Sequence, residues 1–203
     1  MRDILVATTN QDKLAEYRAI FADLPYRLLS LHDRQVDLDV EETGTTFAEN
    51  AELKALTYAR VSGMLSLADD SGLEIDALGG APGVYSARFA GRDTPYVERF
   101  RLILAQLKGL PPEKRTARFR CAITIAEPSG YHRTVEGVIE GIIADAPRGT
   151  QGFGYDPIFL VPESGKTTAE LTPEQKHRIS HRGKAARLAA VMLEHWPEQH
   201  ANG

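Results

Sequence analysis

The segment ILVATTNQDKLAEYRAIF, residues 4–21, joins a short apolar run to a sequence with helical periodicity. The run Ile4–Ala7 is typical of a buried strand. Asn10 follows as an N-cap residue, because its side chain can accept hydrogen bonds from the free N–H groups of a first helical turn. The apolar residues that then share one helix face are Leu14, Tyr17, Ile20 and Phe21. The segment therefore predicts a buried strand, a tight turn and a helix.

Strand and helix patterns continue to alternate along the first half of the chain. The expected elements are a strand at 27–31, a helix from Thr45 or Thr46 to Gly63, a strand at 65–68, and a helix that opens at Thr94 with Pro95 in its first position and closes at Gly109. Each helix begins at a capping residue and ends at a glycine, which readily adopts the left-handed conformation of a helix end. This alternation favours an α/β fold.

The middle of the chain carries a two-strand pattern instead. Residues 118–125 alternate between polar and apolar, with Cys121 on the apolar face, where it is expected to be inert core. Residues 131–143 alternate again after the Pro-Ser-Gly sequence at 128–130. Two alternating runs around a turn predict an antiparallel hairpin.

Two helical signals close the chain. Residues 172–175 have the spacing of a capping box, and Ser180 precedes an Ala- and Leu-rich stretch that reaches about Trp196. Helix-linked strands together with a hairpin predict a mixed β-sheet with flanking helices. We expect residues 1–203 to form a single domain.

The composition bounds the class of protein. The chain of 203 residues has 24 Lys and Arg against 28 Asp and Glu, a net charge of −4, and 42% hydrophobic residues, which excludes a disordered or collagen-like chain. It lacks the broad positive field by which proteins bind nucleic acid polymers or anionic membranes. The N-terminal apolar run is too short for a signal peptide, and the lone Cys121 excludes internal disulfides and a cysteine zinc site. We therefore expect a cytoplasmic protein that binds neither nucleic acid polymers nor membranes.

A candidate phosphate site lies between the first strand and its helix. The sequence there is Thr8-Thr9-Asn10-Gln11-Asp12-Lys13. A helix N-terminus has free N–H groups and a partial positive charge, and the hydroxyls, the Asn10 amide and the Lys13 ammonium add donors. An ordinary helix cap beside a solvated lysine explains the same residues, so the pattern alone leaves both interpretations open.

Acidic residues occur as two adjacent pairs. Glu41 and Glu42 precede a predicted helix, whereas Asp69 and Asp70 end an apolar strand and are followed by Ser71. Open α/β sheets bind ligands at the carboxyl ends of their strands, so paired acids there predict a cation site. Mg²⁺ fits, because it uses one or two carboxylates together with substrate phosphates. A simple turn in which Asp acts as a cap is the alternative.

A basic cluster follows the predicted capping box. Its members are Lys176, His177, Arg178, His181, Arg182, Lys184 and Arg187. A solvated helix face is the simple interpretation, but the step from Ser180 to Gly183 interrupts the helical pattern and predicts a turn that presents donors. Zinc is not favoured, because Arg178 replaces the general-base Glu of the zinc-protease motif and no third ligand is near in the sequence.

Glycines mark one further segment. Gly149, Gly152 and Gly154 surround Phe153, which makes this ring the candidate for stacking on a ligand. Neither glycine-rich run matches the dinucleotide-binding fingerprint, and Leu160 stands where a P-loop ending near residue 167 requires a glycine. A P-loop enzyme is therefore excluded.

Five sequence blocks taken together resemble the inosine triphosphate pyrophosphatase family. The blocks are TTNQDK, EETGTTFAENAELKA, ADDSGLEIDALGGAPGVYSARFAG, FGYDPIF and ISHRGKA, and the resemblance covers residues 4–187. It implies an elongated α/β fold with two lobes around a central cleft, a homodimer, and Mg²⁺ as cofactor. It also implies hydrolysis of non-canonical purine nucleoside triphosphates (ITP, dITP and XTP) to the monophosphate and pyrophosphate.

The resemblance also implies roles for single residues. The implied phosphate-binding residues are Thr8, Thr9, Asn10, Gln11, Asp12, Lys13 and Lys54. The implied metal ligands are Glu41 and Asp70, Asp70 is also the implied general base, and Asp69 and Ser71 line the same site. The implied base-binding residues are Phe153, Gly154, Tyr155, Asp156, Lys176, His181 and Arg182. Many members have glycine at the positions of Thr9 and Asp12, and Asp12 would repel phosphates unless its side chain points to solvent.

Two other functions are compatible with these residues. One is a sanitising pyrophosphatase for modified pyrimidine nucleotides, and the other is a nucleotide sensor or RNA-end binding module without catalysis. The purine-sized set of donors speaks against the first. The carboxylate pair speaks against the second, because such charges are costly in a pure anion binder.

Overall fold

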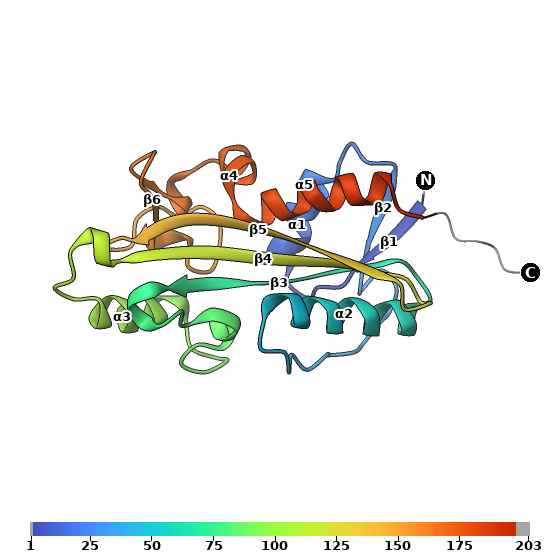
Figure 1. Cartoon of the computed structure of the whole chain (residues 1–203), viewed down its shortest axis with the longest axis horizontal. Coiled ribbons are helices and arrows are strands. Elements are labelled where there is room, and N and C mark those ends of the chain that lie inside the picture. The colour runs from blue at the N-terminus through green and yellow to red at the C-terminus, as the bar shows by residue number, and fades with distance from the viewer. Residues whose placement is uncertain (1, 198–203) are drawn as a thin grey trace, which may run out of the picture.

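The computed structural model describes residues 2–197, in which a seven-stranded mixed sheet runs along the molecule (Figure 1). Its strand order is β2-β1-β3-β4-β5-β6-β7. The strands are β1 (Arg2–Val6), β2 (Tyr26–Ser30), β3 (Ser66–Ile75), β4 (Thr116–Ala126), β5 (His132–Ile143), β6 (Phe159–Val161) and β7 (Lys166–Thr167). β1 is parallel to β2 and β3, whereas the pairs from β3 to β7 are antiparallel. The predicted mixed sheet and hairpin are therefore confirmed.

Helices cover both faces of this sheet. They are α1 (Gln11–Ile20), α2 (Phe47–Ser62), α3 (Tyr96–Gln106), α4 (Pro173–Ile179) and α5 (His181–Glu194). α1 and α5 pack on the face that carries Cys121, which is buried as predicted, and α2 packs on the opposite face (Figure 1). The long strands β3, β4 and β5 connect one core beside α1, α2 and α5 to a second core beside α3 and β6, which gives the expected elongated, two-lobed shape. Within residues 2–197, no helix is long and apolar enough to span a membrane.

The helix boundaries follow the capping residues of the sequence. The side chains that accept a hydrogen bond from a first-turn N–H group are those of Asn10, Thr46, Thr172 and Ser180. Gly63 ends α2 with a φ of 67°, a left-handed conformation that favours glycine. Pro95 is the N-cap of α3, so this helix begins at Tyr96, one residue later than expected, and it ends at Gln106, before the expected Gly109.

The strand predicted at 65–68 is too short. β3 continues to Ile75, because every residue from Ser66 onward pairs with a residue of β4. Asp69 and Asp70 therefore lie within the strand and not at its carboxyl end. Asp70 still borders a crevice, because β1 pairs with β3 only as far as Leu67 and the chain then turns away into α1. Asp69, which was expected to line the same site, lines neither pocket of the cleft described below.

The step from Ser180 to Gly183 is the first turn of α5 and not a free turn. Ser180 Oγ accepts a hydrogen bond from the backbone N–H of Gly183 at 3.0 Å. A Cβ atom at Gly183 would overlap the carbonyl oxygen of His177, so glycine is required where α4 and α5 meet. The close junction buries His181 and Arg182.

Candidate active site

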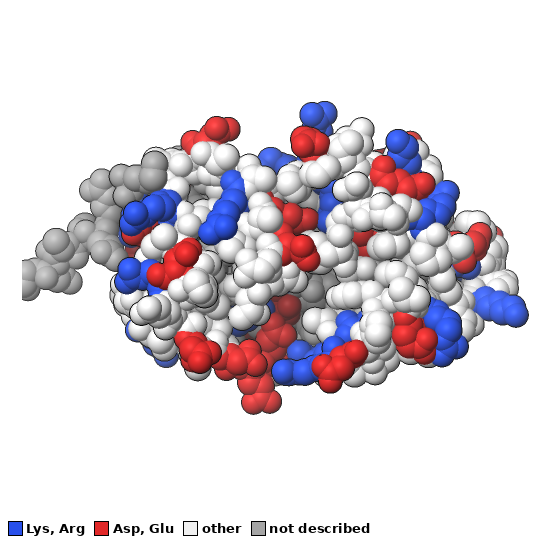
Figure 2. All heavy atoms as spheres, turned by 180° about the vertical axis from the view of Figure 1, so that it is seen from behind, with Lys and Arg blue, Asp and Glu red and all other residues white. Residues whose placement is uncertain are grey.

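A cleft in the middle of the molecule contains two adjoining pockets. Residues that line the first pocket include Phe153, Tyr155, Lys176, His181 and Arg182. Residues that line the second pocket include Thr8, Thr9, Lys54, Arg88 and Arg92. Asn10, Lys13 and Glu42 line both pockets, so the two form one continuous site. Figure 2 shows acidic side chains gathered near the middle of the molecule, on the face turned away in Figure 1.

The turn before α1 brings four of its six predicted residues to this cleft. These are Thr8, Thr9, Asn10 and Lys13. Gln11 and Asp12 are exposed, and Asp12 lines a neighbouring pocket, which shares Phe153 and Lys176 with the first pocket. Since Asp12 lies outside both pockets of the cleft, its carboxylate does not face the predicted phosphate site.

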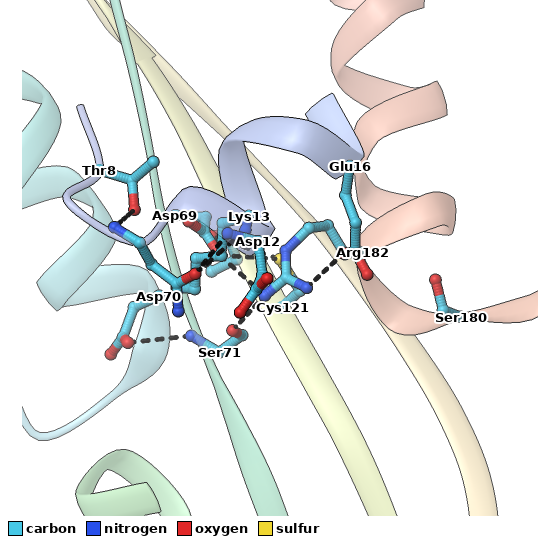
Figure 3. A network of polar contacts seen from close by, with 12 residues as sticks. Thr8, Asp12, Lys13, Glu16, Asp69, Asp70, Ser71, Cys121, Ser180 and Arg182 are labelled. Carbon is cyan, nitrogen blue, oxygen red and sulfur yellow. Dashed lines mark hydrogen bonds and ion pairs between the residues drawn. The ribbon is translucent and has the colours of Figure 1, made fainter. Parts of the chain in front are cut away.

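Asp69 points from β3 toward α1 and α5, where it meets two cations (Figure 3). Lys13 Nζ lies 2.9 Å from its Oδ2, and Arg182 Nη2 lies 3.4 Å from the same oxygen. Burial alone would raise the pKa of Asp69, but the charges of Lys13 and Arg182 outweigh burial and hold the pKa below its usual range. Asp69 is therefore an anion at neutral pH that joins α1 to α5.

Asp70 points to the opposite face, because neighbouring side chains of a strand alternate. Asn50 Nδ2 of α2 donates to its Oδ2 at 3.0 Å, and the backbone N–H of Ser71 donates to its Oδ1 at 2.9 Å. Burial raises the pKa of Asp70, and the negative charge of Glu42 adds to the rise. Lys54 Nζ is 4.0 Å from Asp70 Oδ1 and opposes the rise without reversing it. The two adjacent aspartates thus differ sharply in proton affinity.

Glu42, and not Glu41, is the glutamate of the cleft. Glu41 is exposed and lines neither pocket, so the structure does not bring this predicted metal ligand to Asp70. Glu42 lines both pockets and accepts hydrogen bonds from Lys54 Nζ at 2.5 Å and from Arg88 Nη1 at 3.0 Å. Exposure alternates from residue 41 to residue 45, as expected for an extended segment, which explains why only one of the two glutamates faces inward.

Lys176 and Arg182 share the carboxylate of Glu16 on α1. Lys176 Nζ donates to Glu16 Oε1 at 2.9 Å and to Asp156 Oδ2 at 2.7 Å. Arg182 Nη1 donates to Glu16 Oε2 at 2.7 Å, and its Nη2 donates to Ser71 Oγ at 2.9 Å. Burial alone would raise the pKa of Glu16, but the two cations outweigh it and lower the pKa. The cations of the first pocket are thus fixed before any ligand binds.

Phe153 and His181 are the aromatic groups beside these cations. The Phe153 ring centroid lies 4.8 Å from Lys176 Nζ and 5.4 Å from the Arg182 guanidinium carbon. His181 stacks on Phe119 with ring centroids 4.7 Å apart. Burial lowers the pKa of His181 well below its usual value, and the nearby Arg182 adds to this, so the ring is neutral. The first pocket therefore offers rings and polar groups suited to a flat heterocycle.

Several residues that line the cleft, or that bond to side chains lining it, were not chosen as site residues from the sequence. They are Glu16, Glu42, Asn50, Arg88 and Phe119. Asn50 gives a usable signal, because it is polar at a position that continues the apolar face of α2 and lies four residues before Lys54. Glu16 gives no such signal, since its partners follow about 160 residues later.

The fold and the cleft define the class of an α/β protein whose site fits a ligand with a heterocycle at one end and phosphates at the other. A sequence profile of the Ham1 family matches residues 4–191, and the chain belongs to this family. A protein from Bacillus licheniformis named dITP/XTP pyrophosphatase is 45% identical over 96% of this chain and 99% of its own length. One from Exiguobacterium sibiricum with the same name is 51% identical over 94% and 96%. These findings confirm the resemblance drawn from the five sequence blocks.

Solved structures agree with this assignment. The Ham1 protein of Staphylococcus aureus has a TM-score of 0.86 and 41% identity, covering 97% of this chain and 100% of its own. A HAM1 protein from Coxiella burnetii has a TM-score of 0.88 and 43% identity, covering 96% and 100%. The expected α/β architecture is therefore that of the family.

Proposed function

We propose that the protein hydrolyses non-canonical purine nucleoside triphosphates (ITP, dITP and XTP) to the monophosphate and pyrophosphate. The observation that carries this proposal is the continuity of the two pockets, of which Asp70 lines the first and Glu42 lines both, since one ligand can place a base in the first and phosphates in the second. The name shared by the relatives, dITP/XTP pyrophosphatase, supports the substrate class.

The proposal includes the setting in which the enzyme works. We propose that the whole chain acts as a single domain, forms a homodimer and acts in the cytoplasm without binding nucleic acid polymers, all of which rests on the sequence and on the family resemblance. Light scattering coupled to size-exclusion chromatography tests the dimer, because a mass of 22.3 kDa would contradict it.

Glu42 and Asp70 are the residues that we expect to hold Mg²⁺. Within residues 2–197, no group of three or more His, Cys, Asp or Glu side chains is arranged to hold a metal. Two carboxylates suit Mg²⁺, because it keeps several waters and takes further oxygens from substrate phosphates. Burial and the charge of Glu42 raise the pKa of Asp70, and a divalent cation would relieve that repulsion. When bound, Mg²⁺ neutralises charge on the phosphates and polarises the phosphoryl group.

Asp70 is the general base of the proposed reaction. The hydrogen bonds from Asn50 and from the backbone of Ser71 fix its carboxylate, so it can orient a water molecule toward phosphorus and accept the proton that the water loses. Lys13 and Lys54 then face the negative charge that develops on the phosphate oxygens. The family resemblance supports attack on the α-phosphate, which releases pyrophosphate.

The donors of the first pocket account for the choice of base. Every carboxylate oxygen of Glu16 and Asp156 accepts a hydrogen bond within the protein, from Lys176, Arg182, Phe153 or Thr168. Lys176 uses two of its three N–H groups in these bonds, so a base edge at this point meets a donor that is still free. Hypoxanthine and xanthine present a 6-keto acceptor, whereas adenine presents a 6-amino donor. Guanine shares the 6-keto group but adds a 2-amino donor. The proposal requires that this amino group meets no acceptor, so that guanine is rejected.

A nucleotide panel with Mg²⁺, assayed for pyrophosphate against orthophosphate, tests the proposal. We expect pyrophosphate from ITP, dITP and XTP. Preferred hydrolysis of modified pyrimidine nucleotides would favour the pyrimidine-sanitising alternative. Tight binding without any product would favour a nucleotide-binding module.

A further inference from the structure

The guanidinium of Arg99 lies buried beneath the loop 86–92, which borders the cleft. It donates to four carbonyl oxygens of this loop, at 3.1 and 2.9 Å from Nη1 to Ser86 and Ala87, and at 3.0 and 3.2 Å from Nη2 to Gly91 and Arg92. The planar fork of an arginine can bond both ends of the loop at once, which a single ammonium group cannot do. Arg99 therefore fixes the two ends of the loop relative to each other.

The loop needs support from outside its own sequence. Ala90 has a φ of 61°, in the left-handed region that residues with a Cβ disfavour. Local bonds hold the tip, since Thr94 Oγ1 donates to the Ala90 carbonyl at 2.6 Å and the Gly91 N–H donates to the Arg88 carbonyl at 2.9 Å. They tie the tip to neighbouring residues of the chain and not to the body of the lobe. The Leu73 N–H and the Tyr155 hydroxyl also bond to Ser86 at one end of the loop, whereas Arg99 supplies the connection from α3 at the Gly91 and Arg92 end.

Two arginines on the loop line the second pocket, and their surroundings differ. Arg88 is paired with Glu42 at 3.0 Å. Arg92 is exposed, and within residues 2–197 no carboxylate lies within ion-pair distance of it. Arg92 lines only the second pocket, whereas Lys13 lines both. Its guanidinium is therefore available to an anion at the end of the site away from the base.

We propose that Arg92 binds the distal phosphates of the substrate, those that leave as pyrophosphate, and that Arg99 is the positioning residue that holds Arg92 there. This inference deepens the proposed function and rests on it for the identity of the ligand. Arg99 acts through the loop and touches no substrate. Replacing Arg99 by Lys keeps the charge but removes the planar fork that holds both ends of the loop. We therefore expect Arg99→Lys to weaken phosphate binding as much as loss of the Arg92 contact does.

Isothermal titration with inorganic pyrophosphate and Mg²⁺, and separately with inosine monophosphate, tests this assignment. Arg92→Ala and Arg99→Lys should each weaken pyrophosphate binding about tenfold and leave monophosphate binding within about twofold of wild type. The double variant should be no weaker than the weaker single variant, because both changes remove one contact. Arg101→Lys is the matched control, since Arg101 lies on the same helix and pairs with Glu98 outside both pockets.

Other results overturn the inference. If Arg92→Ala binds pyrophosphate as tightly as wild type does, Arg92 makes no phosphate contact. This conclusion does not depend on whether Arg99→Lys folds. Equal weakening of both ligands by Arg99→Lys, or a double variant about a hundredfold weaker, assigns Arg99 a purely structural role. The titrations need no turnover. The variants can therefore give the expected titration results even if the protein hydrolyses no nucleoside triphosphate. That combination would refute the proposed function and leave the phosphate contact in place.

Discussion

Replacing Asp70 with Asn removes one charge from the cleft and leaves the volume of the side chain nearly unchanged. The carboxylate is the proposed base and metal ligand, so we expect kcat to fall about 10²-fold or more. The fold should persist, because burial already disfavours the Asp70 charge and raises its pKa. We expect the free energy of unfolding to change by less than about 1 kcal/mol.

The Asp69→Asn substitution, one residue earlier, should instead destabilise the fold. Asp69→Asn leaves Lys13 and Arg182 without the carboxylate they share at 2.9 and 3.4 Å. Losing one partner of a buried ion pair costs about 3–5 kcal/mol, and the lower end applies because Arg182 keeps Glu16. At this chain length, about 3 kcal/mol lowers Tm by roughly 6–12 °C. Since the pKa of Asp69 is depressed, its contribution is fully present at pH 7 and is lost only below about pH 4.

Two measurements check this pair of variants. Pyrophosphate release at saturating ITP and Mg²⁺ gives kcat, and thermal unfolding followed by circular dichroism gives Tm. An Asp70→Asn variant with a native spectrum and a kcat within about threefold of wild type refutes the assignment, because the expected loss is far larger. An equal fall of Tm in Asp70→Asn and Asp69→Asn would also refute the reasoning, because it predicts that only the charge of Asp69 stabilises the fold.

Three further outcomes are expected. Glu42→Gln should lower kcat/KM about 10²-fold at saturating Mg²⁺ and Glu41→Gln by less than about threefold, since only Glu42 lines the cleft; equal losses would contradict the metal assignment. ITP and XTP should exceed ATP and GTP in kcat/KM by about 5- to 150-fold, and Arg182→Lys should narrow that gap; equal wild-type rates on GTP and ITP would defeat the donor argument. His181 is buried with a lowered pKa, so below pH 6.5 the unfolded state binds a proton that the folded state does not. The free energy of unfolding, measured by chemical denaturation, should therefore fall by about 1.4 kcal/mol from pH 7.5 to 5.5. A His181→Gln variant with the same pH dependence would show that other groups cause this fall.

Local signals in the sequence predict much of the fold. Asn10, Gly63 and Ser180 mark helix ends through capping bonds that involve only neighbouring residues. The hairpin of β4 and β5 likewise follows from alternation around a short turn. The length of β3 does not follow in this way, because the residues that keep it extended to Ile75 belong to β4, about 50 residues later.

The same limit applies within the site. The motif resemblance selects Asp70 and Arg182, and the structure brings both to one cleft. It selects Glu41, whereas Glu42 lines the cleft, because the side chain that faces inward depends on the path of an irregular segment. Nor does it reveal Glu16, whose role exists only once α4 and α5 pack beside α1.

The two ends of the cleft differ in how firmly their charges are held. Lys176 and Arg182 are 6% and 2% exposed in their side chains, and their partners are nearly as buried, so these ion pairs are rigid and weakly screened. Arg88 and Glu42 are 27% and 22% exposed, so water screens their attraction and phosphate oxygens can compete with Glu42 for the guanidinium. In the proposed function, the rigid end faces the base, which must be distinguished by single hydrogen bonds and needs fixed donors. The looser end, in the same proposal, faces the phosphates, which every nucleoside triphosphate carries and of which the distal two must leave as pyrophosphate after each turnover.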